Sequence, residues 1–256
     1  MLGTAPAWAQ TPDQTAPPPP VRLVVVDPGH GGGDIGATGK AGLREKDLVL
    51  EVAMKLGAQL RLAGIRVIYT READLFLTVA ERAEIANRAK ADLFISLHAN
   101  SSPDPAATGS ETYFVSEKVS DEDARRVAET ENEVFHPEGG AKDSGDVLSQ
   151  ILGDLIRTDH MRGSAEVAMA IQRELALLPT PNRGVKQGPF FVLGGVNMPA
   201  VLLEMGFLTH PEDEERFKTV QYKDMIARAV TRGVMNVSDA RRKLRDRAPT
   251  TRESKR

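Results

Sequence analysis

One stretch near the start of the chain joins a buried strand to a loop that regular structure cannot form. Residues 23–26 are apolar without polar alternation, which predicts a strand buried on both faces and ending at Asp27-Pro28. His30 then follows at the carboxyl end of that strand. So many glycines come next that a helix or strand interior would lose too much backbone entropy. We expect the loop to wrap around a bound group; its glycines are Gly29, Gly31, Gly32, Gly33, Gly36, Gly39 and Gly42.

The glycine loop ends where a helix is expected to begin. Apolar residues recur at helical spacing from Leu48 to Leu60, so Glu45 should lie in the first helical turn. His30 and Glu45 are thus predicted to face each other across the loop. Asp27 either orients His30 through a hydrogen bond or simply forms a turn with the following proline.

The remaining pattern predicts a single α/β domain over residues 21–237, with a mostly parallel twisted sheet and helices on both faces. Thr78 and Glu81 form a capping-box sequence at the start of one helix, and Ser164 should cap a second. Pro211 fits the first turn of a third helix, and a last one should cover residues 220–237. Strands are expected at residues 65–69, 93–97, 111–116, 190–193 and 200–203.

Three segments fall outside this pattern. Within residues 1–20, Ala7-Trp8-Ala9 resembles the cleavage site of a secretory signal and precedes a Pro-rich linker, although a disordered Ala-rich start is the alternative. Residues 117–161 are polar, with helical segments and no evident strand, which is typical of a functional lid or a disordered insert. Residues 238–256 are rich in Lys and Arg and lack a sustained apolar face, so we expect them to fray.

Composition limits the chemistry that the chain can perform. The formal net charge of −3 gives no electrostatic reason to expect nucleic-acid binding. The chain has no Cys, which excludes thiol nucleophiles and leaves His and carboxylates as ligands for any zinc. No apolar run is long enough to cross a bilayer.

Candidate site residues gather where strands of the predicted sheet end. His30, His98 and Glu204 each follow a predicted strand, and ligands bind at the carboxyl ends of strands in open α/β sheets. Two imidazoles and one carboxylate form a catalytic zinc set that leaves a fourth position for water. Of the two glutamates, Glu45 is the better candidate for a zinc ligand because it follows the same loop as His30. Glu204 is the better candidate for the general base.

A phosphate-binding loop is the alternative interpretation of the glycine loop, but no Gly-Lys-Ser/Thr follows the glycines. Solvated or capping roles are expected for His136, His160 and His210.

Five motifs occur in a fixed order along the chain. They are DPGHGG with GATG at 27–39, EK at 45–46, TR with Asp74 at 70–74, SLHAN at 96–100, and LLEMGFLTHPEDE at 202–214. Together they resemble the zinc-dependent N-acetylmuramoyl-L-alanine amidases of bacterial cell division, the type 3 amidases. The resemblance implies one zinc per chain held by His30, Glu45 and His98, with Glu204 as the catalytic carboxylate. The implied substrate is periplasmic peptidoglycan, cut between the lactyl group of N-acetylmuramic acid and L-alanine.

The insert at 117–161 interrupts a compact sheet beside the predicted metal edge, so it either regulates the site or merely covers the sheet or is disordered. The same resemblance favours the regulatory role. Its first helix carries several carboxylates, one of which would occupy the open zinc position until an activator protein displaces the helix. We favour Glu131 among Glu122, Glu129, Glu131 and Glu133. The second helix would dock the lid or receive the activator through Val147, Leu148, Ile151, Leu152, Leu155 and Ile156.

Two other functions share parts of this pattern. A zinc carboxypeptidase-like metallopeptidase would use the same metal site but cut between amino acids. A non-catalytic wall-binding homologue would be expected to lack the proton shuttle, whereas Glu204 is present.

Overall fold

The computed structural model describes residues 18–133 and 158–247. The predicted signal remnant and most of the Pro-rich linker lie outside these residues. The helix expected in the second part of the insert and the last nine residues of the chain, 248–256, lie outside them as well.

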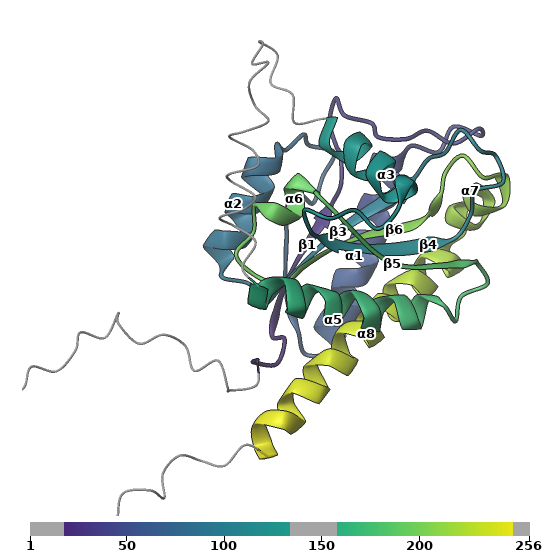
Figure 1. Cartoon of the computed structure of the whole chain (residues 1–256). Coiled ribbons are helices and arrows are strands. Elements are labelled where there is room, and N and C mark those ends of the chain that lie inside the picture. Colours follow the sequence, from purple (N-terminus) through teal and green to yellow (C-terminus); the bar gives the residue numbers. More distant parts are fainter. Residues whose placement is uncertain (1–17, 134–157, 248–256) are drawn as a thin grey trace, which may run out of the picture.

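A six-stranded sheet runs through the centre of the domain in the order β2-β1-β3-β6-β4-β5 (Figure 1). β2, β1, β3 and β6 are parallel, β4 is antiparallel to β6, and β5 is parallel to β4. The prediction of a mostly parallel sheet is therefore confirmed, with one reversed pair at an edge. The strands are β1 Leu23–Pro28, β2 Arg66–Tyr69, β3 Leu93–Asn100, β4 Ser110–Val115, β5 Asn182–Gly188 and β6 Ala200–Phe207.

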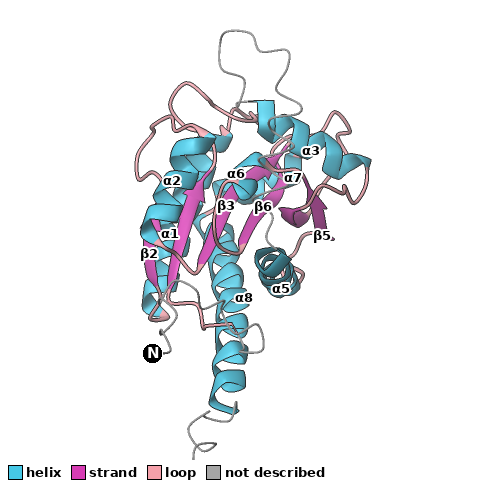
Figure 2. Ribbon diagram, turned by 60° about the vertical axis from the view of Figure 1, so that its left-hand side comes forward, coloured by secondary structure: helices cyan, strands magenta, loops and turns pink. Residues whose placement is uncertain are grey.

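Helices cover both faces of the sheet, as predicted (Figure 2). One face packs against α1 Glu45–Leu62, α5 Thr158–Leu175 and α8 Val220–Arg247, with α7 Pro211–Lys218 beside α8. The other face packs against α2 Val79–Ala89, α3 Glu122–Glu133 and the short α6 Phe191–Gly194. Each face has its own cluster of buried apolar side chains, so the sheet separates two hydrophobic layers.

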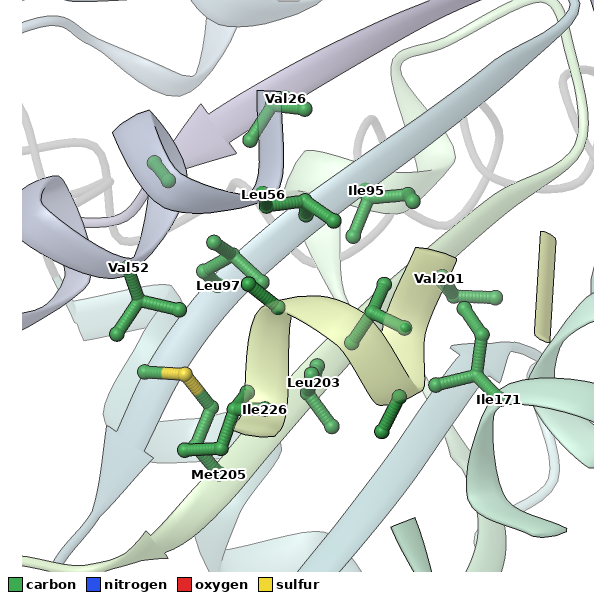
Figure 3. Close-up of a cluster of buried hydrophobic side chains, with 14 of the residues drawn as sticks. Val26, Val52, Leu56, Ile95, Leu97, Ile171, Val201, Leu203, Met205 and Ile226 are labelled. Atoms are coloured by element: carbon green, nitrogen blue, oxygen red, sulfur yellow. The ribbon is translucent and has the colours of Figure 1, made fainter. Parts of the chain in front are cut away.

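The first strand shows why its sequence has no polar alternation. Val24 and Val26 belong to the cluster under α1, α5 and α8, whereas Leu23 and Val25 belong to the cluster under α2, α3 and α6. All four side chains are buried because successive residues of a strand point to opposite faces and both faces are covered. Figure 3 shows the first cluster, in which Val26 lies with Ile95 from β3 and with other side chains from the helices.

The reversed direction of β4 follows from the short connection before it. Only residues 101–109 separate β3 from β4, and β4 lies beyond β6 rather than beside β3. A parallel strand needs a crossover of about a dozen residues or more, usually a helix, to bring the chain back to the starting edge. The nine-residue connection therefore leaves the chain at the carboxyl edge of β3, and β4 runs back from it.

Two expectations about the second half of the chain are wrong. The strand expected at 190–193 is mostly the helix α6, and the strand in this part of the chain is β5, which ends at Gly188, just before α6. β5 has the sequence NRGVKQG and lies at the sheet edge, where several of its side chains remain partly exposed and no apolar pattern is needed. Ser164 caps no helix, because α5 already begins at Thr158. Its hydroxyl donates to the carbonyl oxygen of His160 at 2.7 Å and accepts from the backbone N–H of Ala200 at 2.8 Å.

The expected fraying from residue 238 onward is also wrong as far as Arg247, where α8 ends. Ser238 and Arg241 remain buried against the rest of the domain. The Ser238 hydroxyl donates to the carbonyl of Val21, and the Arg241 guanidinium pairs with Glu166 at 2.7 Å. These contacts extend the helix beyond its apolar stripe.

The predicted helix starts are confirmed where side-chain capping decides them. Thr78 and Glu81 form the reciprocal hydrogen bonds of a capping box at α2. Pro211 occupies the first turn of α7, and His210 caps that helix by accepting from the backbone N–H of Asp213.

Candidate metal centre

Four potential metal ligands meet at the carboxyl edge of the parallel strands. His30 lies two residues beyond β1, His98 lies within β3, Glu45 opens α1, and Glu131 lies near the end of α3. One ligand atom from each of these residues lies within 4.8 Å of the others. The structure therefore brings together the three residues expected to hold metal and the carboxylate expected to block it.

The distances place two carboxylates between two imidazoles. Glu45 Oε1 lies 3.0 Å from His30 Nε2 and 3.1 Å from His98 Nδ1. Glu131 Oε2 lies 2.7 Å from His98 Nδ1 and 3.5 Å from His30 Nε2. The imidazole rings meet edge to face, with centroids 4.9 Å apart.

Glycine is required in the loop because the site side chains press against its backbone. A Cβ atom on Gly29 would lie 2.4 Å from the His98 ring. A Cβ atom on Gly36 would lie 2.6 Å from Glu45 Oε2, and Gly36 also has a φ of +63°. His30 itself has a φ of +55°, which is uncommon for a residue other than glycine. The loop is thus folded tightly around the ligands, as the glycine pattern suggested.

The surrounding backbone and one further carboxylate fix the orientation of the ligands. Glu45 accepts hydrogen bonds from the backbone N–H groups of Ala37 at 2.8 Å and Ala99 at 2.9 Å. Asp34 Oδ2 lies 2.9 Å from His30 Nδ1, on the opposite side of the ring from Nε2. Sequence reasoning missed Asp34, although its place four residues after His30 in the same loop was a usable signal.

Asp27 does not orient the His30 ring by direct contact, which was one of its two expected functions. It is buried and accepts from Thr70 Oγ1 at 2.6 Å, Ser96 Oγ at 2.8 Å and Arg82 Nη1 at 2.8 Å. Burial raises the pKa of Asp27, but Arg82 and the two hydroxyls outweigh it and hold that pKa below its usual value. Asp27 therefore binds the guanidinium group of Arg82, and Asp34 is the carboxylate that contacts the His30 ring.

The charges of the ligands perturb one another strongly. Burial disfavours the charged imidazole of His98, but Glu131 followed by Glu45 raises its pKa to about 10. Burial likewise opposes protonation of His30, but Glu45, Asp34 and Glu131 hold its pKa well above the usual value. Burial would raise the pKa of Glu45, but both imidazoles lower it. The site thus concentrates carboxylate charge that favours a cation between the rings.

Glu204 lies beside this cluster rather than in it. Its backbone lies opposite His98 in the pairing of β6 with β3. Glu204 is therefore inside β6 and not at the end of a strand as expected. Neither carboxylate oxygen of Glu204 has a hydrogen-bond partner among the described residues, although both are buried. Burial and then the Glu131 carboxylate raise the pKa of Glu204 well above its usual value. A buried carboxyl group with a raised pKa next to a cluster of ligands is suited to proton transfer.

A cavity of about 330 Å³ opens onto the cluster. Its walls are the glycine loop at residues 33–37, the end of β3 at residues 99–101, and α3. Glu131 and Glu133 contribute side chains from the helix. The cavity therefore lies between the ligands and the first helix of the insert.

The residues present suit a zinc ion. Nitrogen and carboxylate oxygen are zinc donors, and the set offers two imidazoles and one carboxylate besides Glu131. His30 Nε2 is buried and makes no hydrogen bond within the described part of the chain, although Glu45 Oε1 is only 3.0 Å away. A cation bound between these two atoms would give the buried nitrogen the partner that it lacks.

Comparison with known proteins identifies the family. The family profile described as N-acetylmuramoyl-L-alanine amidase matches residues 24–236. The chain belongs to this family. The matched range includes the residues of all six strands except Leu23, and the family expected from the five sequence motifs is confirmed.

Individual relatives agree with the family assignment. The amidase AmiA of Escherichia coli is 36% identical over 218 residues, which cover 84% of this chain and 75% of AmiA. The amidase AmiC of Neisseria meningitidis is 31% identical over 214 residues, covering 83% of this chain and 51% of AmiC. The crystal structure of an N-acetylmuramoyl-L-alanine amidase from Clostridium difficile matches with a TM-score of 0.65 at 29% identity, covering 86% of this chain and 98% of that one.

Proposed function

We propose that this amidase is a zinc-dependent peptidoglycan hydrolase that cuts the amide between the lactyl group of N-acetylmuramic acid and L-alanine. The observation that carries the proposal is the meeting of His30, Glu45 and His98 beside the buried Glu204, within a chain of the amidase family. A single catalytic zinc with three protein ligands leaves a position for water and substrate.

Each residue of the site has a distinct role in this proposal. His30 would bind zinc through Nε2 and His98 through Nδ1, the atoms that face Glu45. The chemistry supplied by bound zinc is polarisation of the amide carbonyl and a lowered pKa for water. Glu204 would take the proton of the attacking water and return it to the leaving amine nitrogen as the C–N bond breaks. Asp34 would hold the His30 ring through Nδ1.

The proposal is tested by separating zinc binding from catalysis. Glu204→Gln should retain one zinc per chain and lose at least about two orders of magnitude in rate on labelled peptidoglycan, the usual contribution of a positioned proton shuttle. Glu84→Gln on the exposed side of α2 is the control and should leave both zinc content and rate unchanged. A folded Glu204→Gln variant with near wild-type turnover would move the shuttle role to another residue.

We also propose that α3 holds the enzyme inactive by placing Glu131 at the zinc position intended for water. Glu131 Oε2 contacts both imidazoles, and its side chain is only 10% exposed. Among the other candidates, Glu122 is 87% exposed and pairs with Arg125 instead. A carboxylate among the zinc donors would compete with water and substrate for the open position.

The rest of α3 is built to keep Glu131 in place. Its apolar side packs Ala124, Val127 and Ala128 into the cluster under α2, α3 and α6. At its end, Asn132 donates to the carbonyl of Pro189 at 2.8 Å and accepts from the backbone N–H of Phe191 at 3.0 Å. Deleting the whole insert would uncover this apolar surface, so a substitution of Glu131 alone tests the inhibition more cleanly.

The release of α3 would need a partner, and the enzyme would need export to meet its substrate. We propose that an activator protein displaces α3, with the apolar positions between Val147 and Ile156 as its contact; these positions lie outside the described residues. We further propose a periplasmic location, supported by the Ala7-Trp8-Ala9 sequence and the peptidoglycan substrate. None of the helices in the described part of the chain is long and apolar enough to span a membrane.

A further inference from the structure

Two buried arginines hold the backbone that carries the first metal ligand. Arg82 from α2 donates through Nη1 to the carbonyl of Pro28 at 2.8 Å and through Nη2 to the carbonyl of His30 at 2.7 Å. Arg71 donates through Nε to Pro28 at 3.0 Å and through Nη2 to the carbonyl of Gly29 at 2.7 Å. Three consecutive carbonyls, at residues 28, 29 and 30, are thus bound by two guanidinium groups.

The backbone at this point would not hold its shape unaided. His30 lies in the left-handed region with a φ of +55°, and Gly31 and Gly32 after it have φ values of +126° and +58°. Such a conformation costs on the order of 1 kcal/mol or more for a residue with a side chain, and it persists only when its surroundings fix it. The fixed conformation decides where the His30 ring points.

Both arginines are anchored so that their donors face the carbonyls. Arg82 is 5% exposed, and Asp27 binds its Nη1 at 2.8 Å while the carbonyl of Leu77 accepts from its Nε at 3.1 Å. Arg71 is 3% exposed, and it also donates to the carbonyl of Lys46 at 3.0 Å, next to the ligand Glu45. The second arginine thereby links the His30 loop to the start of the helix that carries the second ligand.

We infer that Arg71 and Arg82 form a guanidinium clamp that positions His30 for zinc. Neither arginine contacts the metal ligand atoms, so both are positioning residues that act through the backbone of residues 28–30. The inference rests on the proposed zinc site. It assigns Asp27 a purpose as well, since its carboxylate holds Arg82 in the clamp.

Lysine cannot replace either arginine in this arrangement. Its single ammonium group can keep the charge opposite Asp27 but has no planar fork to bind neighbouring carbonyls at fixed angles. Arg82→Lys and Arg71→Lys therefore retain charge and most of the buried side-chain volume while loosening the carbonyls. Arg88→Lys is the matched control, because Arg88 lies on α2 with Arg82 but is 78% exposed and pairs only with Glu84 among the described residues.

The experiment measures metal binding by the full chain independently of catalysis. Zinc dissociation constants come from competition with a chromophoric chelator, the visible spectrum of the cobalt-substituted protein reports ligand geometry, and circular dichroism with thermal unfolding reports the fold. We expect each folded clamp variant to bind zinc about tenfold or more weakly, the usual effect of losing a group that orients a ligand, with a changed cobalt spectrum. Arg88→Lys should change neither quantity.

Several results would overturn the inference. Folded Arg82→Lys and Arg71→Lys proteins with the wild-type zinc affinity and cobalt spectrum would show that the clamp does not position His30. If only one variant folds, that variant decides the matter. If neither folds, the arginines serve the fold rather than the ligand. A wild-type chain that binds no zinc would instead contradict the proposed function, and the clamp with it.

Discussion

Replacing Glu131 by glutamine should activate the enzyme without any partner protein. The Glu131 carboxylate lies 2.7 Å from His98 Nδ1, in a site that is largely closed to solvent. In the zinc-loaded protein His98 Nδ1 would bind the metal, so the Glu131 carboxylate would interact with the cation instead. That interaction should contribute at least as much as a hydrogen bond to a charged group, about 1.5–3 kcal/mol, and every 1.4 kcal/mol changes an equilibrium about tenfold. Glutamine keeps the shape and the helix propensity but loses the charge, so the ratio of open to closed enzyme should rise by about 10- to 150-fold.

The assay is release of dye from labelled peptidoglycan by zinc-loaded protein without an activator. The basal rate should rise by the same factor until the open form predominates, after which further loosening of α3 has no effect. Glu122→Gln is the matched control, because that side chain lies on the same helix but faces solvent. A folded, zinc-loaded Glu131→Gln protein that is no faster than the wild type would refute autoinhibition by this residue.

Three further outcomes follow from the geometry of the site. Asp34→Asn should weaken zinc binding by about 10- to 100-fold in chelator competition, because the carboxylate that orients His30 is lost; an unchanged affinity would show that the ring needs no such partner. Gly36→Ala should yield protein with little bound zinc by metal analysis, since the added carbon would lie 2.6 Å from Glu45 Oε2; a full zinc content would mean that the loop can yield. The pKa of Asp27 lies below its ordinary value of about 3.9, so its carboxylate stabilises the fold above that pH and the stabilisation is lost as the pH falls through the lowered pKa. Asp27→Asn should therefore lower the melting temperature at pH 7, and the melting temperature of this variant should fall less steeply than that of the wild type as the pH is lowered. Melting temperatures that fall in parallel in the two proteins would contradict this.

Local sequence determined the parts of the fold that local physics controls. The apolar run at residues 23–26 could be recognised as a doubly buried strand because nothing polar interrupts it. The capping box at Thr78 could be recognised because its two hydrogen bonds involve residues three apart. The proximity of His30 and Glu45 could be predicted because a glycine loop connects them and folds back on itself.

Other features depend on contacts between distant segments, which no local pattern encodes. β5 is a polar edge strand whose pairing with β4 is provided by the sheet and not by its own sequence. Arg82 occupies a helix position where an arginine usually faces solvent, and only the fold shows that it binds Asp27 and the loop before His30. The burial of Arg241 in the C-terminal part of α8 likewise involves Glu166, from a helix about 75 residues earlier.

Cleavage of the lactyl amide is tested most directly by mass analysis of the products that the zinc-loaded Glu131→Gln protein releases from purified peptidoglycan. We predict stem peptides that begin with a free L-alanine amino group, together with glycan strands whose lactyl groups carry a free carboxylate. These products should disappear when a chelator removes zinc and return when zinc is restored. Products cut between amino acids, with the lactyl amide intact, would show that the protein is a metallopeptidase and not an amidase of this bond.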